Sequence, residues 1–268
     1  FVKKKLRCKV FVIDDLLRKH HADVILDQTV LRDSSEYKRL NSDAIVLAGC
    51  DFALLNYNFI TYRKKTLNTS KSLSNIRVLI SMGGVDQPNA TLQTLHVLSK
   101  ISGKKPLVTV LLSSKAPNYQ SIKEFSQQNS SWVTHIDFVD NMAELMSSHH
   151  IAIGAPGATS WERAYLGIPS IIITLADNQK TISTNLVKVG AAISLNLANI
   201  KSGLLSAYKA IINEWSSMRE ANLLLCDGLG LLRVTQAVNS LCRNQTNLIT
   251  LRPANKTAGI AIFSFFSS

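Results

Sequence analysis

Two glycine-containing turns are the part of this sequence best suited to bind an anionic ligand. Gly83 and Gly84 follow the apolar run Arg77–Ser81, and Gly157 follows the apolar run Ile151–Ile153. Each turn leads into a segment with a helical pattern. Because a helix N-terminus has unpaired N–H groups and partial positive charge, such a turn can hold a diphosphate. The pattern points to a nucleotide-linked ligand.

The second turn, Gly157-Ala158-Thr159, is followed by Glu162 and allows two interpretations. In the first, Thr159 and the neighbouring N–H groups bind a diphosphate, and Glu162 accepts hydrogen bonds from two ribose hydroxyls. In the second, Thr159 and Glu162 form a capping box that serves the helix alone. The spacing leaves both open. For Gly83 and Gly84 the corresponding choice is between close approach to a ligand and a tight turn.

Polar residues also follow two other apolar runs. Asp177, Asn178 and Gln179 end a run of strand length, where polar side chains are costly unless they face a cleft or cap a helix. Capping explains Asn178 but not all three. Asp14 and Asp15 end another run, where they could bind a metal, orient a sugar or form a solvated turn. The adjacent histidine pairs point in different directions on any regular element, so no metal site is expected.

Apolar runs of strand length alternate with helical patterns along the chain, which is typical of parallel βαβ units. Helices are expected to begin near Asn89, Asn118, Asn141, Thr159 and Gln179, each close to a capping residue type. Residues 200–241 have a helical pattern. The expected strands are Lys9–Ile13, Val24–Leu26, Ala44–Leu47, Arg77–Ser81, Leu107–Leu112, Val133–Phe138, Ile151–Ile153, Ser170–Thr174 and Ala192–Leu195.

Length and pattern together predict two domains. A chain of 268 residues with 46% hydrophobic content exceeds the usual size of one domain, roughly 100–200 residues. We expect an N-terminal Rossmann-like domain at residues 1–58, a linker at 59–75, a C-terminal Rossmann-like domain at 76–243, and a tail of unknown role at 244–268. The chain begins at Phe1 and enters a strand pattern at once, so the first domain is expected to be incomplete.

Composition excludes several classes of protein. The chain has 30 Lys and Arg against 18 Asp and Glu, but the basic residues form short separate groups, so no nucleic-acid partner is expected. Its four cysteines include no Cys-x-x-Cys pair, which argues against a zinc site or disulfide framework and fits the cytoplasm. No apolar run approaches the roughly 18–20 residues of a membrane span. Oligomeric state is not predicted.

Several segments in order resemble one family, the UDP-2,4-diacetamido-2,4,6-trideoxy-β-L-altropyranose hydrolases of pseudaminic acid biosynthesis. These enzymes are related to the MurG-like glycosyltransferases. The resemblance extends from about Val10 to Gly190. It rests on Val12–Leu16, on Ala22-Asp23 with Leu26–Gln28, on Gly49 with Asp51–Leu55, on Ser81 with Gly83, Gly84 and Asp86, on Met142–Met146, and on the run from Ile153 to Gln179.

The resemblance implies an α/β fold of the glycosyltransferase-B type and hydrolysis of a UDP-linked diacetamido trideoxy sugar to UDP and the free sugar. It implies no cofactor and no metal. Gly83, Gly84, Gly157, Ala158 and Thr159 would then lie near the diphosphate. By the same resemblance Glu162 contacts the ribose, Asn178 and Gln179 face the cleft, and Asp14 is a candidate catalytic residue on the sugar side.

The sequence departs from this family at several positions. The family opens with a Gly-x-Gly-His turn whose histidine is the favoured catalytic base, and that residue is expected upstream of Phe1. Pro156 and Ala158 stand where Gly and Ser are more usual, and His150 stands where Asp is common. Two alternatives stay open. One is a MurG-like UDP-sugar glycosyltransferase, and the other is a non-catalytic sugar-nucleotide binder.

Overall fold

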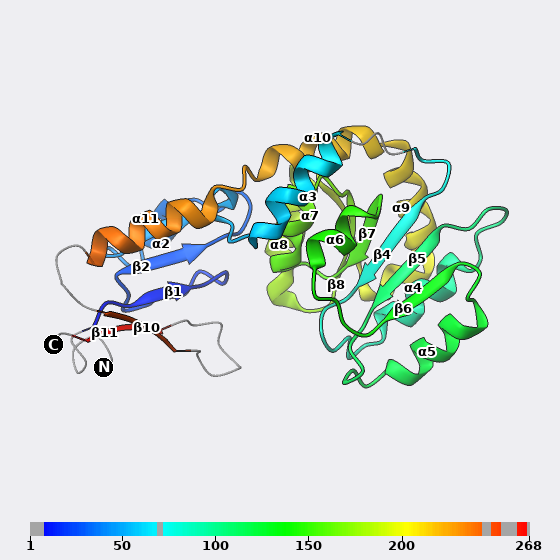
Figure 1. The fold of residues 1–268 in the computed structure, drawn as a ribbon, viewed down its shortest axis with the longest axis horizontal. Coiled ribbons are helices and arrows are strands. Elements are labelled where there is room, and N and C mark those ends of the chain that lie inside the picture. The colour runs from blue at the N-terminus through cyan, green and yellow to red at the C-terminus, as the bar shows by residue number, and fades with distance from the viewer. Residues whose placement is uncertain (1–7, 69–71, 243–247, 253–261, 267–268) are drawn as a thin grey trace. The chain divides into compact units, whose positions relative to one another are not determined.

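The computed structural model describes residues 8–68, 72–242, 248–252 and 262–266, and the chain folds as two compact units. Unit 1 comprises Phe1–Leu55 together with Cys226–Ser268, and unit 2 comprises Asn56–Leu225. Each unit has its own parallel sheet (Figure 1). The two units are described separately below.

Unit 2 is built on a six-stranded parallel sheet in the order β6-β5-β4-β7-β8-β9. The chain moves outward from β4 through β5 to β6, returns to the centre at β7, and then moves outward on the other side. This doubly wound order has its topological switch point between β4 and β7. The strands are β4 (Arg77–Ser81), β5 (Leu107–Leu111), β6 (Val133–Ile136), β7 (Ile151–Gly154), β8 (Ser170–Thr174) and β9 (Ala192–Asn196).

Helices connect these strands and bury the apolar side chains of the sheet. Leu95 and Leu204, from two different helices, share one buried cluster with Ile80 and Ile153 of the central strands. Strands buried on both faces are apolar throughout, which accounts for the uninterrupted Ile-rich runs. The helices of unit 2 are α3 (Tyr57–Asn68), α4 (Ala90–Leu98), α5 (Tyr119–Gln128), α6 (Met142–Ser147), α7 (Ala158–Tyr165), α8 (Lys180–Lys188), α9 (Ile200–Asn213) and α10 (Trp215–Leu225), with single 3₁₀ turns η2 (Asp177–Gln179) and η3 (Leu197–Asn199).

The two central strands approach each other unusually closely at their carboxyl ends. Ser81 of β4 pairs with Gly154 of β7. A Cβ atom on Gly154 would lie 2.2 Å from the Ser81 carbonyl oxygen, a separation that real Cβ atoms do not reach. Glycine is therefore required at position 154, because no side chain fits between the strands there.

Unit 1 contains a three-stranded parallel sheet in the order β1-β2-β3, formed by Phe11–Ile13, Val24–Asp27 and Ile45–Ala48. Helix α2 (Ser34–Lys38) lies between β2 and β3, and the 3₁₀ turn η1 (Cys50–Phe52) follows β3. Helix α11 (Gly230–Cys242) covers the sheet, with Val234 buried among Phe11 and Leu26. Strands β10 (Leu248–Arg252) and β11 (Ile262–Phe266) pair as an antiparallel ribbon.

Most of the expected elements are present, with two differences in how the chain is divided. The expected linker at 59–75 is largely helix α3, which belongs to unit 2. Arg63 of this helix donates a hydrogen bond to the Leu223 carbonyl in the same unit. Residues 226–242, expected in the second domain, belong to unit 1. None of the helices in the described part of the chain is long and apolar enough to cross a membrane.

Substitution of Gly154 by alanine is predicted to destabilise unit 2. Because the added Cβ would overlap the Ser81 carbonyl, the strands must separate, and we expect a loss of about 1–3 kcal/mol in the free energy of unfolding, measured by urea denaturation. Gly84→Ala is the matched control, since no atom lies within 4 Å of its added Cβ. Equal stability of the two variants would contradict the close approach.

Candidate functional site

The predicted ligand-binding residues of unit 2 come together at one edge of its sheet. Gly83 and Gly84 follow β4, Gly157 follows β7, and Asn178 follows β8. These three strands are parallel neighbours, with Ser81 opposite Gly154 and Gly154 opposite Ile172, so their carboxyl ends lie level. Open α/β sheets bind ligands at this edge, beside the switch point. The candidate site is this carboxyl edge.

The turn after β4 is open to solvent, but the helix that it leads into is already capped. Gly83 has φ +90°, and both glycines are exposed with no atom within 4 Å of an added Cβ. The buried Asp86 carboxylate accepts hydrogen bonds from the amides of Ala90 and Thr91, each at 2.8 Å. The expected cap, Asn89, has φ +55° and makes no capping bond. Asp86 therefore occupies the N-terminus of α4.

The turn after β7 leads into a helix whose N-terminus is open. Helix α7 begins at Ala158, and the Gly157 amide donates to the Ser160 hydroxyl at 3.2 Å. Among the described residues, the amides of Ala158 and Thr159 have no hydrogen-bond acceptor. The capping box expected between Thr159 and Glu162 is not formed, because the helix begins at Ala158, two residues earlier than that pattern requires. Two free N–H groups face the edge of the sheet.

Glu162 is a half-buried carboxylate on α7, one turn from these amides. It makes no hydrogen bond or ion pair with any residue that the structure describes. Burial raises the pKa of Glu162 to about 6, and the charge of the adjacent Arg163 offsets part of that rise. A desolvated carboxylate without hydrogen-bond donors is costly, so a ligand that supplies donors would stabilise it.

In the turn after β8, one side chain supports the backbone and the others are exposed. Gln179 accepts a hydrogen bond from the Leu175 amide through Oε1 at 2.9 Å, which fixes the exit of the strand and leaves its NH₂ group available. Asp177 forms an exposed ion pair with Lys180 at 2.7 Å. Asn178 is exposed. Asn178 and the NH₂ group of Gln179 are the polar groups that this turn presents.

Phe138 is a residue at this edge that the sequence pattern did not single out. Its side chain is 76% exposed, and it follows β6. Sequence reasoning placed Phe138 inside the strand, whereas the strand ends at Ile136. Its position between Asp137 and Asp140 could have marked it, because an aromatic residue inside a polar loop is not a core residue. An exposed ring of this kind can stack on a nucleobase.

Asp14, the candidate of unit 1, is fully buried in a hydrogen-bonded network. Its carboxylate accepts from Arg18 Nε at 2.7 Å and from the Tyr37 hydroxyl at 2.9 Å, and His20 Nε2 lies 3.2 Å away. The Tyr37 hydroxyl also lies 3.0 Å from Asp27, which is paired with Arg32 at 2.7 Å. The network joins the ends of β1 and β2 to helix α2.

These contacts leave Asp14 ionised and weakly basic. Burial alone would raise the pKa of Asp14, but hydrogen bonds from Arg18, Tyr37 and His20 together lower it to about 2. Burial and the two neighbouring carboxylates raise the pKa of the Tyr37 hydroxyl. A carboxylate with so low a pKa is a poor general base near neutral pH. The geometry favours Asp14 as a residue that shapes its edge of the sheet.

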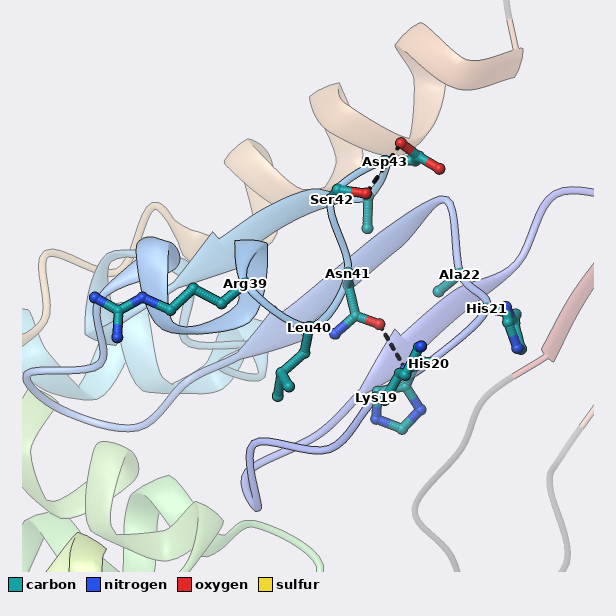
Figure 2. Close-up of a pocket in the computed structure, with 10 residues that line it drawn as sticks. Lys19, His20, His21, Ala22, Arg39, Leu40, Asn41, Ser42 and Asp43 are labelled. Carbon is teal, nitrogen blue, oxygen red and sulfur yellow. Dashed lines mark hydrogen bonds between the residues drawn. The ribbon is translucent and has the colours of Figure 1, made fainter.

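Unit 1 also has a polar hollow of about 400 Å³ at the opposite, amino edge of its sheet (Figure 2). Lys19, His20, His21 and Arg39 line it, on the segments that lead into β2 and β3. Asn41 joins these segments, since its Oδ1 accepts from the His20 amide, as Figure 2 shows. No sequence-predicted site residue lies in this hollow. Across the described residues, no group of three or more His, Cys, Asp or Glu could hold a metal ion.

Comparison with known proteins identifies the family of this chain. The model of the glycosyltransferase family 28 C-terminal domain matches residues 56–222, which is more than half of the chain and nearly all of unit 2. The chain therefore belongs to this family.

Two curated relatives are distant and longer. The UDP-2,4-diacetamido-2,4,6-trideoxy-beta-L-altropyranose hydrolase of Campylobacter jejuni is 26% identical over 190 residues, covering 70% of this chain and 66% of that protein. The spore coat polysaccharide biosynthesis protein SpsG of Bacillus subtilis is 22% identical over 206 residues, covering 73% and 58%. The chain spans 37–66% of the length of the curated relatives it matches.

Solved structures show the fold. MurG of Acinetobacter baumannii superimposes with a TM-score of 0.61 at 13% identity, covering 89% of this chain and 68% of that one. The parallel α/β sheet of unit 2, with its doubly wound strand order, thus has the MurG-like glycosyltransferase-B architecture that the sequence predicted. At this identity the likeness carries the fold alone.

Asp14→Asn is predicted to destabilise unit 1 at neutral pH and much less in acid. Because the pKa of Asp14 is held below its unfolded value, the stabilisation is present above about pH 4 and is lost as pH falls toward 2. We expect a loss of about 2 kcal/mol in the opening free energy of β1–β3, measured by amide hydrogen exchange near pH 7. Asp43→Asn is the control, since Asp43 is an exposed carboxylate whose side chain accepts a hydrogen bond from Ser42. An equal loss near pH 2.5 would contradict the role of ionised Asp14.

Proposed function

We propose that this member of the glycosyltransferase family 28 C-terminal domain family binds the UDP portion of a UDP-linked sugar at the carboxyl edge of unit 2. The observation that carries the proposal is the pairing of an unpartnered, half-buried Glu162 with the open N-terminus of α7 on one short helix. Uridine diphosphate supplies what both groups need, since its ribose has hydroxyl donors and its diphosphate is anionic.

The diphosphate is assigned to α7 rather than α4. The amides of Ala158 and Thr159 are free, whereas those of Ala90 and Thr91 are bound by Asp86. A carboxylate at the N-terminus of α4 would also repel a phosphate. The exposed Gly83-Gly84 turn is proposed to approach the ligand through its backbone, because the absence of side chains leaves room there.

The base and the sugar are assigned to the two sides of this diphosphate. Phe138 is proposed to stack on the uracil, because β6 lies three strands from β7 and thus roughly 14 Å away, a distance that an extended nucleotide can span. Asn178 and the Gln179 amide are proposed to contact the diphosphate or the sugar. The network around Asp14 is proposed to shape the carboxyl edge of the unit 1 sheet.

We propose further that the reaction is hydrolysis, as the name of the Campylobacter jejuni relative states for that protein. A water molecule attacks the anomeric carbon, the bond between that carbon and the diphosphate oxygen breaks, and UDP and a free diacetamido trideoxy sugar result. Diphosphate stabilisation at α7 and positioning of the water supply the catalysis. A role in pseudaminic acid biosynthesis and a cytoplasmic location belong to the same proposal.

Glycosyl transfer is the second candidate, because the family that matches unit 2 is described as a glycosyltransferase domain. The experiment that decides between them follows the products of UDP-2,4-diacetamido-2,4,6-trideoxy-β-L-altropyranose by mass spectrometry, with and without candidate acceptors, on the full-length protein. We expect UDP and free sugar in equal amounts without an acceptor. Release of UDP only when an acceptor is added would contradict hydrolysis and support transfer.

Glu162→Gln is predicted to weaken UDP binding and to remove the preference for a ribose 2′-hydroxyl. A hydrogen bond to a charged group contributes about 1.5–3 kcal/mol, so we expect an affinity loss of roughly tenfold or more near pH 7.5, measured by calorimetry. The loss should be small for 2′-deoxy-UDP. Because the variant removes a desolvated charge, its unfolding temperature should not fall.

The pH dependence of this contact follows from the pKa of about 6. Glu162 is ionised above pH 6 and protonated below it, so its contribution to UDP affinity should fall as pH decreases from 7 to 5. The terminal phosphate of UDP also titrates near pH 6. The Glu162→Gln variant shows how UDP affinity changes with pH through titration of the ligand alone. Identical pH profiles of UDP affinity for the two proteins would remove Glu162 from the site.

A further inference from the structure

Arg163 is a charged residue inside unit 2 that the proposed contacts do not use. Its side chain is only 4% exposed, and none of the described carboxylates forms an ion pair with it. Its donors go to carbonyl and hydroxyl oxygens of the β7–α7 turn, with the Ala155 carbonyl at 2.9 Å and the Thr159 carbonyl at 3.1 Å. The hydroxyls of Thr159 and Ser160 lie at 3.4 and 3.3 Å.

The guanidinium keeps its charge in this position. Burial lowers the pKa of Arg163 to about 10, and the neighbouring Glu162 opposes that fall, so the group stays protonated at neutral pH. Buried cations are usually paired with anions, because carbonyl oxygens satisfy the donors without neutralising the charge. A positive charge held by carbonyl oxygens, without a direct ion pair to any described carboxylate, therefore lies behind the turn.

The surrounding backbone is arranged to admit this side chain. A Cβ atom on Gly154 would lie 3.2 Å from Arg163 Nη1, so the glycine required between β4 and β7 also gives the guanidinium its space. Because Arg163 binds the carbonyl groups of Ala155 and Thr159, those groups point inward. The amides of Ala158 and Thr159 are left free at the same turn.

We propose that Arg163 is the positioning residue of the diphosphate site. It holds the β7–α7 turn in the shape that presents the free amides, and its charge attracts the diphosphate from behind the turn without touching it. This inference rests on the proposed function for the identity of the ligand, but its effect on the turn does not depend on any ligand.

The test compares UDP with uridine, which has the same base and ribose but no charge. Arg163→Met keeps the length of the side chain and removes its charge and donors. We expect it to lower UDP affinity by about tenfold or more, with less than about a threefold change for uridine, both measured by calorimetry. Arg163→Lys restores the charge without the forked donors, so it should recover part of the preference for UDP.

Arg219→Met is the control for loss of an arginine whose donors bind backbone carbonyls. Arg219 on α10 also donates to backbone carbonyls, those of Gly167 and Thr66, but Gly167 precedes β8 and lies at the other edge of the sheet. We expect this variant to lose stability and to keep the UDP-to-uridine affinity ratio. An unchanged ratio in Arg163→Met, with the protein folded, would overturn the proposal.

Amide hydrogen exchange without ligand provides the second readout. In Arg163→Met the amides of Gly157 and Ser160, which are hydrogen-bonded within the turn, should exchange faster than in the native protein, while those of β8 should not change. If the methionine variant does not fold, the same comparison is made with Arg163→Lys. Unchanged exchange at the turn would overturn the positioning role, whereas absence of UDP binding by the native protein would overturn the proposed function instead.

Discussion

The close pairing of β4 with β7 is the constraint on which the rest of unit 2 depends. The doubly wound order places these two strands at the centre, and the register brings Ser81 level with Gly154. Because position 154 has no side chain, β4 and β7 can pair closely there. The turns that follow these two strands therefore lie at the same edge of the sheet. The same gap admits the Arg163 guanidinium, so one glycine serves both the sheet and the turn.

The charges at this edge are distributed unequally between its two helices. The Asp86 carboxylate neutralises the N-terminus of α4, whereas α7 has free amides and a buried cation behind them. These charges favour an anion at the N-terminus of α7 over one at the N-terminus of α4. Glu162 lies one turn further along α7, where we propose that it accepts hydrogen bonds from the ribose hydroxyls.

The strands and the carboxyl edge of the sheet could be predicted from the sequence, because buried parallel strands are uniformly apolar and glycine turns mark their ends. The residues that cap the helices could not be predicted in the same way. Asp86 caps α4 in place of Asn89 because it lies far enough back to reach two amides, and Thr159 cannot cap α7 because that helix begins at Ala158. Both depend on where the chain turns, which residue types alone do not determine.

Long-range packing accounts for the remaining differences. Helix α11 belongs to unit 1 because Val234 packs on the β1–β3 sheet, a contact between distant parts of the sequence. For a similar reason, the sequence could not show whether Asp14 or Glu162 is the better candidate for ligand binding. Asp14 receives its donors from Arg18, Tyr37 and the protein backbone and is satisfied within the fold, while Glu162 is desolvated without donors. A carboxylate that the fold leaves unsatisfied is the stronger indication of a ligand, and this is the reason why we propose that the binding chemistry lies in unit 2.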